Sequence, residues 1–166
     1  MDRSTRMVAL GAALAAALAL GIAFVSERWG GLVPCALCLL ERWPYRVIVV
    51  LGLAASLLPL RPARMMLWLI LLPLLAAIAL GVTHVGVERG LWPSPLPECA
   101  APRVPHGGSI ADRMAAMPAR PAKPCDEPTF LIPGLPVSMA AMNLVYALGF
   151  AIVLSISLLR GKRAAR

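Results

Sequence analysis

Apolar residues in this chain form unbroken blocks, without the alternating apolar and polar spacing of a soluble domain. Four blocks are long enough for a helix to cross about 30 Å of hydrocarbon. They comprise residues 7–25, 39–60, 65–87 and 137–159. Because a chain inside a bilayer must satisfy its backbone hydrogen bonds internally, the pattern predicts an all-α, four-helix transmembrane bundle. Residues 1–166 then form a single integral membrane domain, in which residues 26–38 and 88–136 are the longer connections.

The first block has a second interpretation, as a secretory signal peptide. Arg3 and Arg6 precede an apolar stretch, and residues 17–19 (Ala-Leu-Ala) have the small side chains of a cleavage site. The apolar run continues to Val25 without a polar break, which favours an uncleaved first helix. Cleavage would leave three helices without changing the orientation of the others.

The formal charge of +8 is unevenly distributed. The two termini and the connection after residue 60 carry eight basic residues and one acid, Asp2, whereas residues 88–136 carry five of each sign. This asymmetry predicts that both termini are cytoplasmic and that the two longer connections lie on the opposite side. We expect no nucleic-acid partner, because the positive charge belongs to helix ends that face the cytoplasm. The eight basic residues are Arg3, Arg6, Arg61, Arg64, Arg160, Lys162, Arg163 and Arg166.

All four cysteines fall outside the cytoplasm in this topology. Cys35 and Cys38 follow the first helix, and Cys99 and Cys125 lie in the long connection. An even number of cysteines in an oxidising compartment indicates disulfides, and two structural bridges are one interpretation. A bridge between Cys35 and Cys38 closes a very small ring, however, and constrains the unfolded chain little. No second closely spaced pair suggests zinc, and no histidine follows Cys38 as haem attachment requires, so we interpret the pair as redox-active and expect no metal.

Charged residues crowd the start of the second block. Glu41, Arg42 and Arg46 lie at the level of the outer headgroups or just below, where arginine is costly and a candidate for function. Pro44 is best tolerated in a first turn, so the helix is expected to begin near residues 40–43. The alternative for both arginines is that they reach outward to lipid phosphates.

Cys38 is expected near the positive end of this helix, with Arg42 one turn further on. Both features favour a thiolate at Cys38. The segment therefore predicts an activated dithiol at headgroup level, within reach of a lipid-soluble electron acceptor.

Three segments resemble the DsbB family of bacterial inner-membrane quinone reductases. "PCALCLLERWPYR", residues 34–46, is similar to the family signature, with an arginine seven residues after the first cysteine. "THVGVERGLWPSPLPEC", residues 83–99, and "CDEPTFLIPGLPVSMAAMN", residues 125–143, resemble the second cysteine loop and the entry to the fourth helix. The resemblance covers nearly the whole chain in order.

The resemblance implies a thiol:quinone oxidoreductase of the bacterial inner membrane, with its cysteines facing the periplasm. A reduced periplasmic thioredoxin-like oxidase, similar to DsbA, would attack a Cys99–Cys125 disulfide at Cys99. Cys125 would then attack Cys35 and release Cys38. The Cys38 thiolate would donate to ubiquinone or menaquinone, with Arg42 stabilising the developing charge.

Other polar residues near the outer face have predicted roles. Arg46 joins Arg42 as a candidate for quinone binding. His84 and Glu88, one turn apart at the outer end of the third helix, are candidates to hydrogen-bond the quinone ring or to carry protons to the outer face. The alternative for His84 and Glu88 is a helix-end pair satisfied by the loop. Asn143 is expected to form an interhelical hydrogen bond. Residues 109–117 resemble a capped helix with one apolar face, which predicts a short interfacial helix in the long loop.

Two other functions fit part of this pattern. A vitamin K epoxide reductase-like enzyme also combines a Cys-x-x-Cys pair with a quinone, but that pair is expected near the end of a late helix. A membrane scaffold whose cysteines are only structural is the non-enzymatic alternative. The small residues between Gly11 and Gly21 leave open whether the first helix packs within the bundle or against a second copy.

Overall fold

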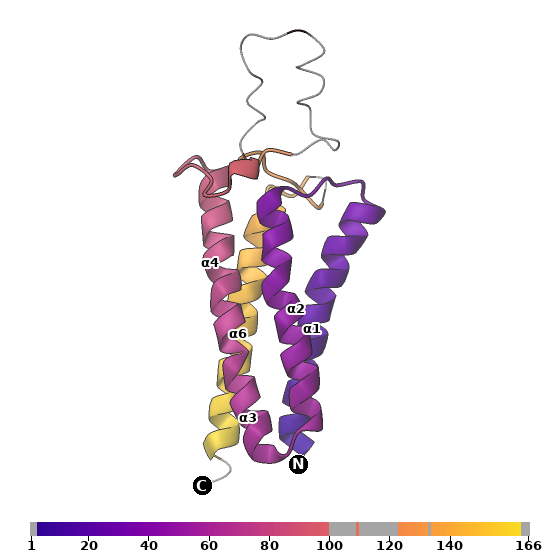
Figure 1. Cartoon of the computed structure of the whole chain (residues 1–166), viewed down its shortest axis with the longest axis vertical. Coiled ribbons are helices and arrows are strands. Elements are labelled where there is room, and N and C mark those ends of the chain that lie inside the picture. Colours follow the sequence, from indigo (N-terminus) through magenta and orange to yellow (C-terminus); the bar gives the residue numbers. More distant parts are fainter. Residues whose placement is uncertain (1–2, 100–108, 110–122, 133, 164–166) are drawn as a thin grey trace.

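The computed structural model describes residues 3–99, 109, 123–132 and 134–163. Its regular structure is all helical, as the sequence predicts, and four long rods run alternately up and down (Figure 1). One rod is interrupted at Ile70, which divides it into α3 and α4. The elements are α1 (Arg3–Arg28), α2 (Ala36–Leu57), α3 (Leu60–Leu69), α4 (Leu71–Glu88), the 3-10 turn η1 (Pro97–Cys99) and α6 (Met139–Arg163).

Three of the four rods are long and apolar enough to cross a membrane. They are Arg3–Arg28, the combined rod Leu60–Glu88, and Met139–Gly161. The remaining rod, α2, carries Glu41, Arg42 and Arg46 within its 22 residues, so its composition is less apolar. It nevertheless packs lengthwise against both α1 and α4 inside the same bundle. The structure thus has the four helices expected, with α2 as the rod that brings charge into the bundle.

The second helix begins earlier than the sequence analysis expected. It starts at Ala36, not near residues 40–43, and Pro44 lies well inside it. The Cys35 side chain accepts a hydrogen bond from the backbone N–H of Cys38 and so caps the first turn. A proline within a helix is tolerated when packing against neighbouring helices compensates for the lost backbone bond. The expected start was therefore wrong, because the cysteine side chain supplies a cap that proline placement alone does not reveal.

Small residues let the helices approach one another closely. Ala9, Ala12 and Ala16 on α1 are buried, and the position of a Cβ at Gly52 of α2 would be 3.0 Å from the backbone of α1. On the other side of the bundle, a Cβ at Gly81 of α4 would lie 3.2 Å from Leu144 of α6. Such contacts are how helices associate where lipid removes the hydrophobic driving force. The alanine face of α1 therefore packs within the bundle.

The start of α1 and the end of α6 lie at the same end of the bundle (Figure 1). The opposite end carries η1 and the segment before α6, which is tied down by a hydrogen bond of 2.7 Å from the Met139 N–H to the Thr129 carbonyl. The Lys123 ammonium also donates to the Thr129 hydroxyl at 2.7 Å. The interfacial helix expected for residues 109–117 lies, apart from Ser109, outside the described residues. The bundle thus presents its cysteines at the end away from the termini.

Candidate active site

The two cysteines of the Cys-x-x-Cys pair are held together by the first turn of α2. Cys35 is the N-cap and Cys38 lies one turn on, which brings the two Sγ atoms to 2.8 Å. Both are free thiols, and they are directed differently. Cys35 is buried and lies 3.5 Å from His84 Nε2, whereas Cys38 is half-buried and lines a cavity. One sulfur therefore faces the bundle interior and the other faces the cavity.

The other two cysteines form a disulfide in the same place. Cys99 and Cys125, 26 residues apart, are bonded to each other and are 5% and 1% exposed. Together with Cys35 they belong to one apolar cluster at this end of the bundle, and Cys38 packs against it. The same cluster includes Leu37 of α2 and Val87 of α4. The fold thus gathers all four cysteines, although nearly ninety residues separate the first from the last.

A buried chain of hydrogen bonds starts at Cys35. His84 Nε2 lies beside the Cys35 sulfur, and His84 Nδ1 is 3.0 Å from Glu41 Oε1. The Asn143 amide donates to Glu41 Oε2 at 3.0 Å, and the Tyr45 hydroxyl donates to Asn143 Oδ1 at 2.7 Å. The chain therefore joins α2, α4 and α6, and the expected interhelical hydrogen bond of Asn143 is confirmed.

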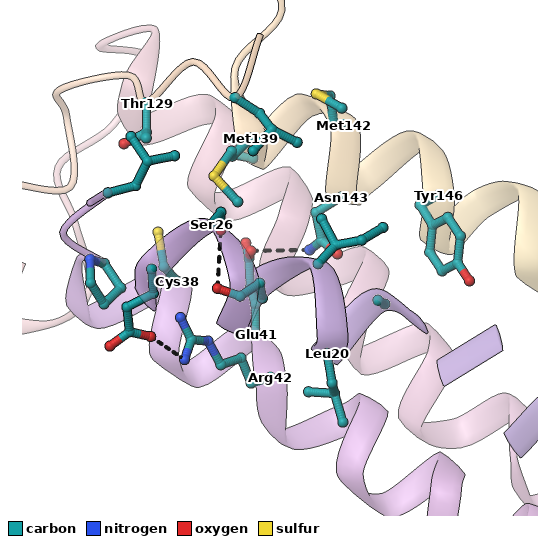
Figure 2. A pocket seen from close by; sticks show the side chains of 18 of the residues that line it. Leu20, Ser26, Cys38, Glu41, Arg42, Thr129, Met139, Met142, Asn143 and Tyr146 are labelled. Carbon is teal, nitrogen blue, oxygen red and sulfur yellow. Dashed lines mark hydrogen bonds and ion pairs between the residues drawn. The ribbon is translucent and has the colours of Figure 1, made fainter. Parts of the chain in front are cut away.

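A cavity of about 190 Å³ opens on the other side of α2. Residues of α1, α2 and α6 line it, together with Thr129 and Leu131, and its walls are mainly apolar (Figure 2). The polar groups on its wall include Cys38, Glu41 and Arg42. An apolar cavity with a few convergent polar groups is the usual form of a small-molecule site.

Arg42 is the cation of this cavity. Its guanidinium donates to Glu27 Oε2 at 2.7 Å (Figure 2). It also lies 4.9 Å from the centre of the Phe24 ring. In the part of the chain that the structure describes, Arg42 Nε is the one buried side-chain nitrogen or oxygen without a hydrogen-bond partner. A buried donor without a partner is costly. A ligand with a carbonyl oxygen would satisfy it.

The electrostatics favour Cys35 as the first thiol to lose its proton. The hydrogen bond from the Cys38 thiol outweighs burial and, with a contribution from His84, lowers the pKa of Cys35 to about 4. Cys35 precedes α2, so it also receives the positive end of the helix. From the sequence, this activation was expected at Cys38, assisted by Arg42. The structure instead gives the helix cap and the histidine to Cys35 and pairs Arg42 with Glu27.

Two of the predicted binding residues lie away from the cavity lining. Arg46 is exposed and stacks on Trp43, with its guanidinium carbon 5.2 Å from the ring centre. Glu88 accepts a hydrogen bond from the Ser138 hydroxyl, which ties the end of α4 to the start of α6. His84 contacts Cys35 and reaches the cavity only through Glu41.

The dithiol and the histidine also form a set of potential metal ligands. Ligand atoms of Cys35, Cys38 and His84 lie within 4.8 Å of one another. Among the residues that the structure describes, this group has three members, one fewer than a closed tetrahedral zinc site. Formation of the Cys35–Cys38 disulfide would remove two of the three ligands. The geometry suits a redox pair better than a permanent metal site.

The comparisons with known proteins agree with this geometry. The family model described as "Disulfide bond formation protein DsbB" matches residues 5–157. The chain belongs to the DsbB family. It is also similar to the "Uncharacterized protein RP370" of Rickettsia prowazekii (strain Madrid E), with 32% identity over 142 residues, 85% of this chain and 80% of that protein. No solved structure matches the chain. Membership of the DsbB family makes this a membrane protein of a disulfide-forming oxidoreductase family.

Sequence reasoning missed the roles of Glu27 and Glu41 in the DsbB-type site. Glu41 was noted only for its depth in an apolar segment, and Glu27 was given no role. An ionisable residue within a spanning segment is a sign of function, so Glu41 carried a signal. Glu27 carried none, because its partner lies 15 residues away on another helix.

Proposed function

We propose that this protein reoxidises a periplasmic DsbA-like dithiol oxidase and passes the electrons to a membrane quinone. The observation that carries the proposal is the position of the Cys35–Cys38 pair between two features. On one side is the Cys99–Cys125 disulfide, in the same apolar cluster; on the other is the cavity that Cys38 lines. Electrons taken up at the loop disulfide therefore have a short route to the cavity.

The first half of the reaction is thiol–disulfide exchange. A thiolate of the reduced partner attacks Cys99, and the Cys99–Cys125 bond breaks with its electron pair going to Cys125. Cys125 then attacks Cys35 of an oxidised Cys35–Cys38 pair and releases Cys38. The partner's second thiolate attacks the mixed disulfide, which frees the oxidised partner and releases Cys99. The Cys99 thiolate then attacks Cys125 of the Cys35–Cys125 bond, which restores the loop disulfide and releases Cys35. The shared cluster of the four cysteines supports this exchange.

The second half takes place at the cavity. A quinone supplies two-electron acceptor chemistry, and the cavity suits its ring, because the walls are apolar and Arg42 Nε has no partner among the described residues. Cys38 is the sulfur that faces the acceptor, and Arg42 would hold an acceptor oxygen and stabilise negative charge on it. Either ubiquinone or menaquinone meets these requirements, since both carry ring carbonyl oxygens.

The distribution of charge supports one orientation in the membrane. The starts of α1 and α3, which carry Arg3, Arg6, Arg61 and Arg64, lie at the end of the bundle opposite the cysteines (Figure 1). We infer that this end is cytoplasmic, so that the cysteines face the periplasm of the bacterial inner membrane. The membership of the DsbB family supports this function over the vitamin K epoxide reductase-like and scaffold alternatives.

The test is quinone reduction by the purified protein with a reduced DsbA-like partner. We expect turnover by the wild type and none by Cys38→Ser, which retains the loop disulfide for the first exchange. Ser56→Ala is the matched control: Ser56 is a buried polar residue of the same helix whose hydroxyl bonds only to the Leu53 carbonyl. Unchanged turnover in Cys38→Ser, or no turnover by folded wild type with either quinone, would exclude the proposal.

A further inference from the structure

The reaction must remove two protons from the Cys35–Cys38 pair, and the two thiols have different surroundings. Cys38 lines the cavity, so its proton has a direct exit. Cys35 is 4% exposed and absent from the cavity lining. A buried thiol needs a neighbouring base before it acts as a nucleophile. The question is which group removes the Cys35 proton and where that proton goes.

The group beside Cys35 is His84, and its second ring nitrogen is bound to a carboxylate. His84 Nε2 is 3.5 Å from Cys35 Sγ, and His84 Nδ1 is 3.0 Å from Glu41 Oε1. His84 and Glu41 are 3% and 7% exposed. A thiol, an imidazole and a carboxylate in this order form a nucleophile, a base and the group that orients the base.

The hydrogen bonds around Glu41 assign the proton on His84. Oε2 of Glu41 accepts from the Asn143 amide, whose own oxygen accepts from Tyr45. With Oε2 occupied by a donor, Oε1 accepts the Nδ1–H of His84. This leaves His84 Nε2 as the nitrogen that faces Cys35 and takes up its proton. Asn143 and Tyr45 are positioning residues, because they fix the carboxylate without contacting the reacting sulfur.

Glu41 also lines the cavity, and this connects the buried thiol to the place of reduction. The Glu41 and Asn143 side chains meet at the cavity wall, beside Arg42 and Cys38 (Figure 2). The path from Cys35 through His84 to Glu41 therefore begins at a sulfur that does not line the cavity and ends at a carboxylate that does. No water or mobile segment is needed to complete it.

We propose that His84 is the base that deprotonates Cys35, and that Glu41 receives this proton and delivers it to the cavity. The inference rests on the function proposed above. In the reduced pair the Cys35 proton rests on His84 Nε2, and His84 gives its Nδ1–H to Glu41 as the disulfide forms. The Cys35 sulfur bonds to the Cys38 sulfur, and the two electrons leave through Cys38 to an acceptor of the quinone class. The Cys38 proton and the proton on Glu41 complete its reduction to a quinol.

Two variants separate proton transfer from orientation. His84→Asn removes the base. Glu41→Gln is nearly isosteric and still offers His84 an oxygen acceptor, but it cannot accept a proton. Thr83→Ala is the matched control, since Thr83 precedes His84 on α4 and its hydroxyl bonds only to the Ala79 carbonyl of its own helix.

The first readout is the rate of quinone reduction in a single turnover by protein whose Cys35–Cys38 pair has been reduced beforehand. General base catalysis typically contributes about 10²- to 10⁴-fold. We expect His84→Asn to slow this step at least about a hundredfold and Glu41→Gln at least about tenfold, with Thr83→Ala unchanged. If Glu41→Gln retains the wild-type rate, Glu41 carries no proton and the proposal fails.

The second readout needs no quinone. Titration of the thiolate absorbance of reduced, quinone-free protein gives the pKa of Cys35. The titratable groups that face Cys35 are Cys38 from α2 and His84 from α4, with Glu41 behind His84. Cys99 and Cys125 do not titrate, because they are bonded to each other. We expect this pKa to rise in His84→Asn. An unchanged pKa would show that His84 does not interact with the thiol, even if the variant loses activity through misfolding.

The two proposals fail in different ways. If wild type reduces no quinone, the function proposed above is wrong, whatever the variants do. If wild type turns over and both variants match it, the function stands and the proton path is wrong. Attack of the reduced partner at Cys99 does not use the path, so formation of the mixed disulfide should remain normal in both variants.

Discussion

In the ion pair between Glu27 and Arg42, only the arginine is buried, so removing one partner should cost a different free energy from removing the other. The Arg42 side chain is 8% exposed, whereas the Glu27 side chain is 37% exposed. Replacing Glu27 by alanine leaves a buried guanidinium without its counter-ion, a change that typically costs about 3–5 kcal/mol for a fully buried pair. Because Glu27 is partly solvated, we expect a smaller loss, about 2–3 kcal/mol of unfolding free energy.

The opposite change should cost less. Arg42→Met leaves Glu27 in contact with water and places an apolar side chain in an apolar cavity. It loses the stacking on Phe24, which is worth about 0.5–1 kcal/mol. We therefore expect Arg42→Met to lower the unfolding free energy by no more than about 1 kcal/mol, although it should abolish quinone reduction.

The double variant gives the decisive comparison. Once Arg42 is methionine, Glu27→Ala has no buried charge to expose, so its additional cost should fall below about 0.5 kcal/mol. The assay is denaturant unfolding of the four proteins in the same detergent micelles, at fixed salt and pH. If Glu27→Ala costs the same with and without Arg42, the two residues are independent and the reasoning is wrong.

Three further predictions concern the site and its surroundings. In reduced protein, Cys38→Ala removes the largest contribution to the low pKa of Cys35, so the thiolate midpoint should rise from about 4 toward 9.0; a midpoint that stays acidic contradicts this. Since folding lowers this pKa, the Cys35 thiolate stabilises the folded reduced protein fully above pH 9.0, and that stability is lost as pH falls through about 4. Unfolding free energies measured across this range should show the loss in reduced protein and not in oxidised protein. Gly86→Ala must displace the Trp92 ring, which should lower the unfolding free energy by about 1–3 kcal/mol. Gly11→Ala meets open space and should raise the unfolding free energy by about 0.5 kcal/mol. Equal unfolding free energies for the two variants would refute the packing argument.

The helical framework could be predicted from the sequence because lipid imposes a simple requirement. A spanning segment must be long, apolar and internally hydrogen-bonded, and α1 and α6 show this without ambiguity. The ends of the helices were harder to predict, because they depend on local caps. The Cys35 sulfur extends α2 by one turn beyond its expected start, and no apolar pattern encodes that hydrogen bond.

The residues of the site were partly predictable for a related reason. Cys35 and Cys38 are informative by spacing alone, and Arg42 by its depth in an apolar segment. Their partners come from distant parts of the chain: His84 is 49 residues from Cys35, and Asn143 is 102 residues from Glu41. Periodicity describes one helix at a time, so it shows that a polar residue is buried without showing what it meets.

This division explains why the arginine was predicted to activate the thiol, whereas in the structure the histidine lies beside the buried thiol and the arginine lines the cavity. Along the sequence, Arg42 is one turn from Cys38, and His84 is far from either cysteine. In the bundle, close contact between α2 and α4 brings His84 to Cys35, while α1 supplies Glu27 to hold Arg42 at the cavity. A base belongs beside the sulfur that must lose a buried proton, and a cation belongs where the acceptor gains negative charge. The packing of four helices thus places a histidine and an arginine on opposite sides of one dithiol, an arrangement that spacing within a single helix cannot provide.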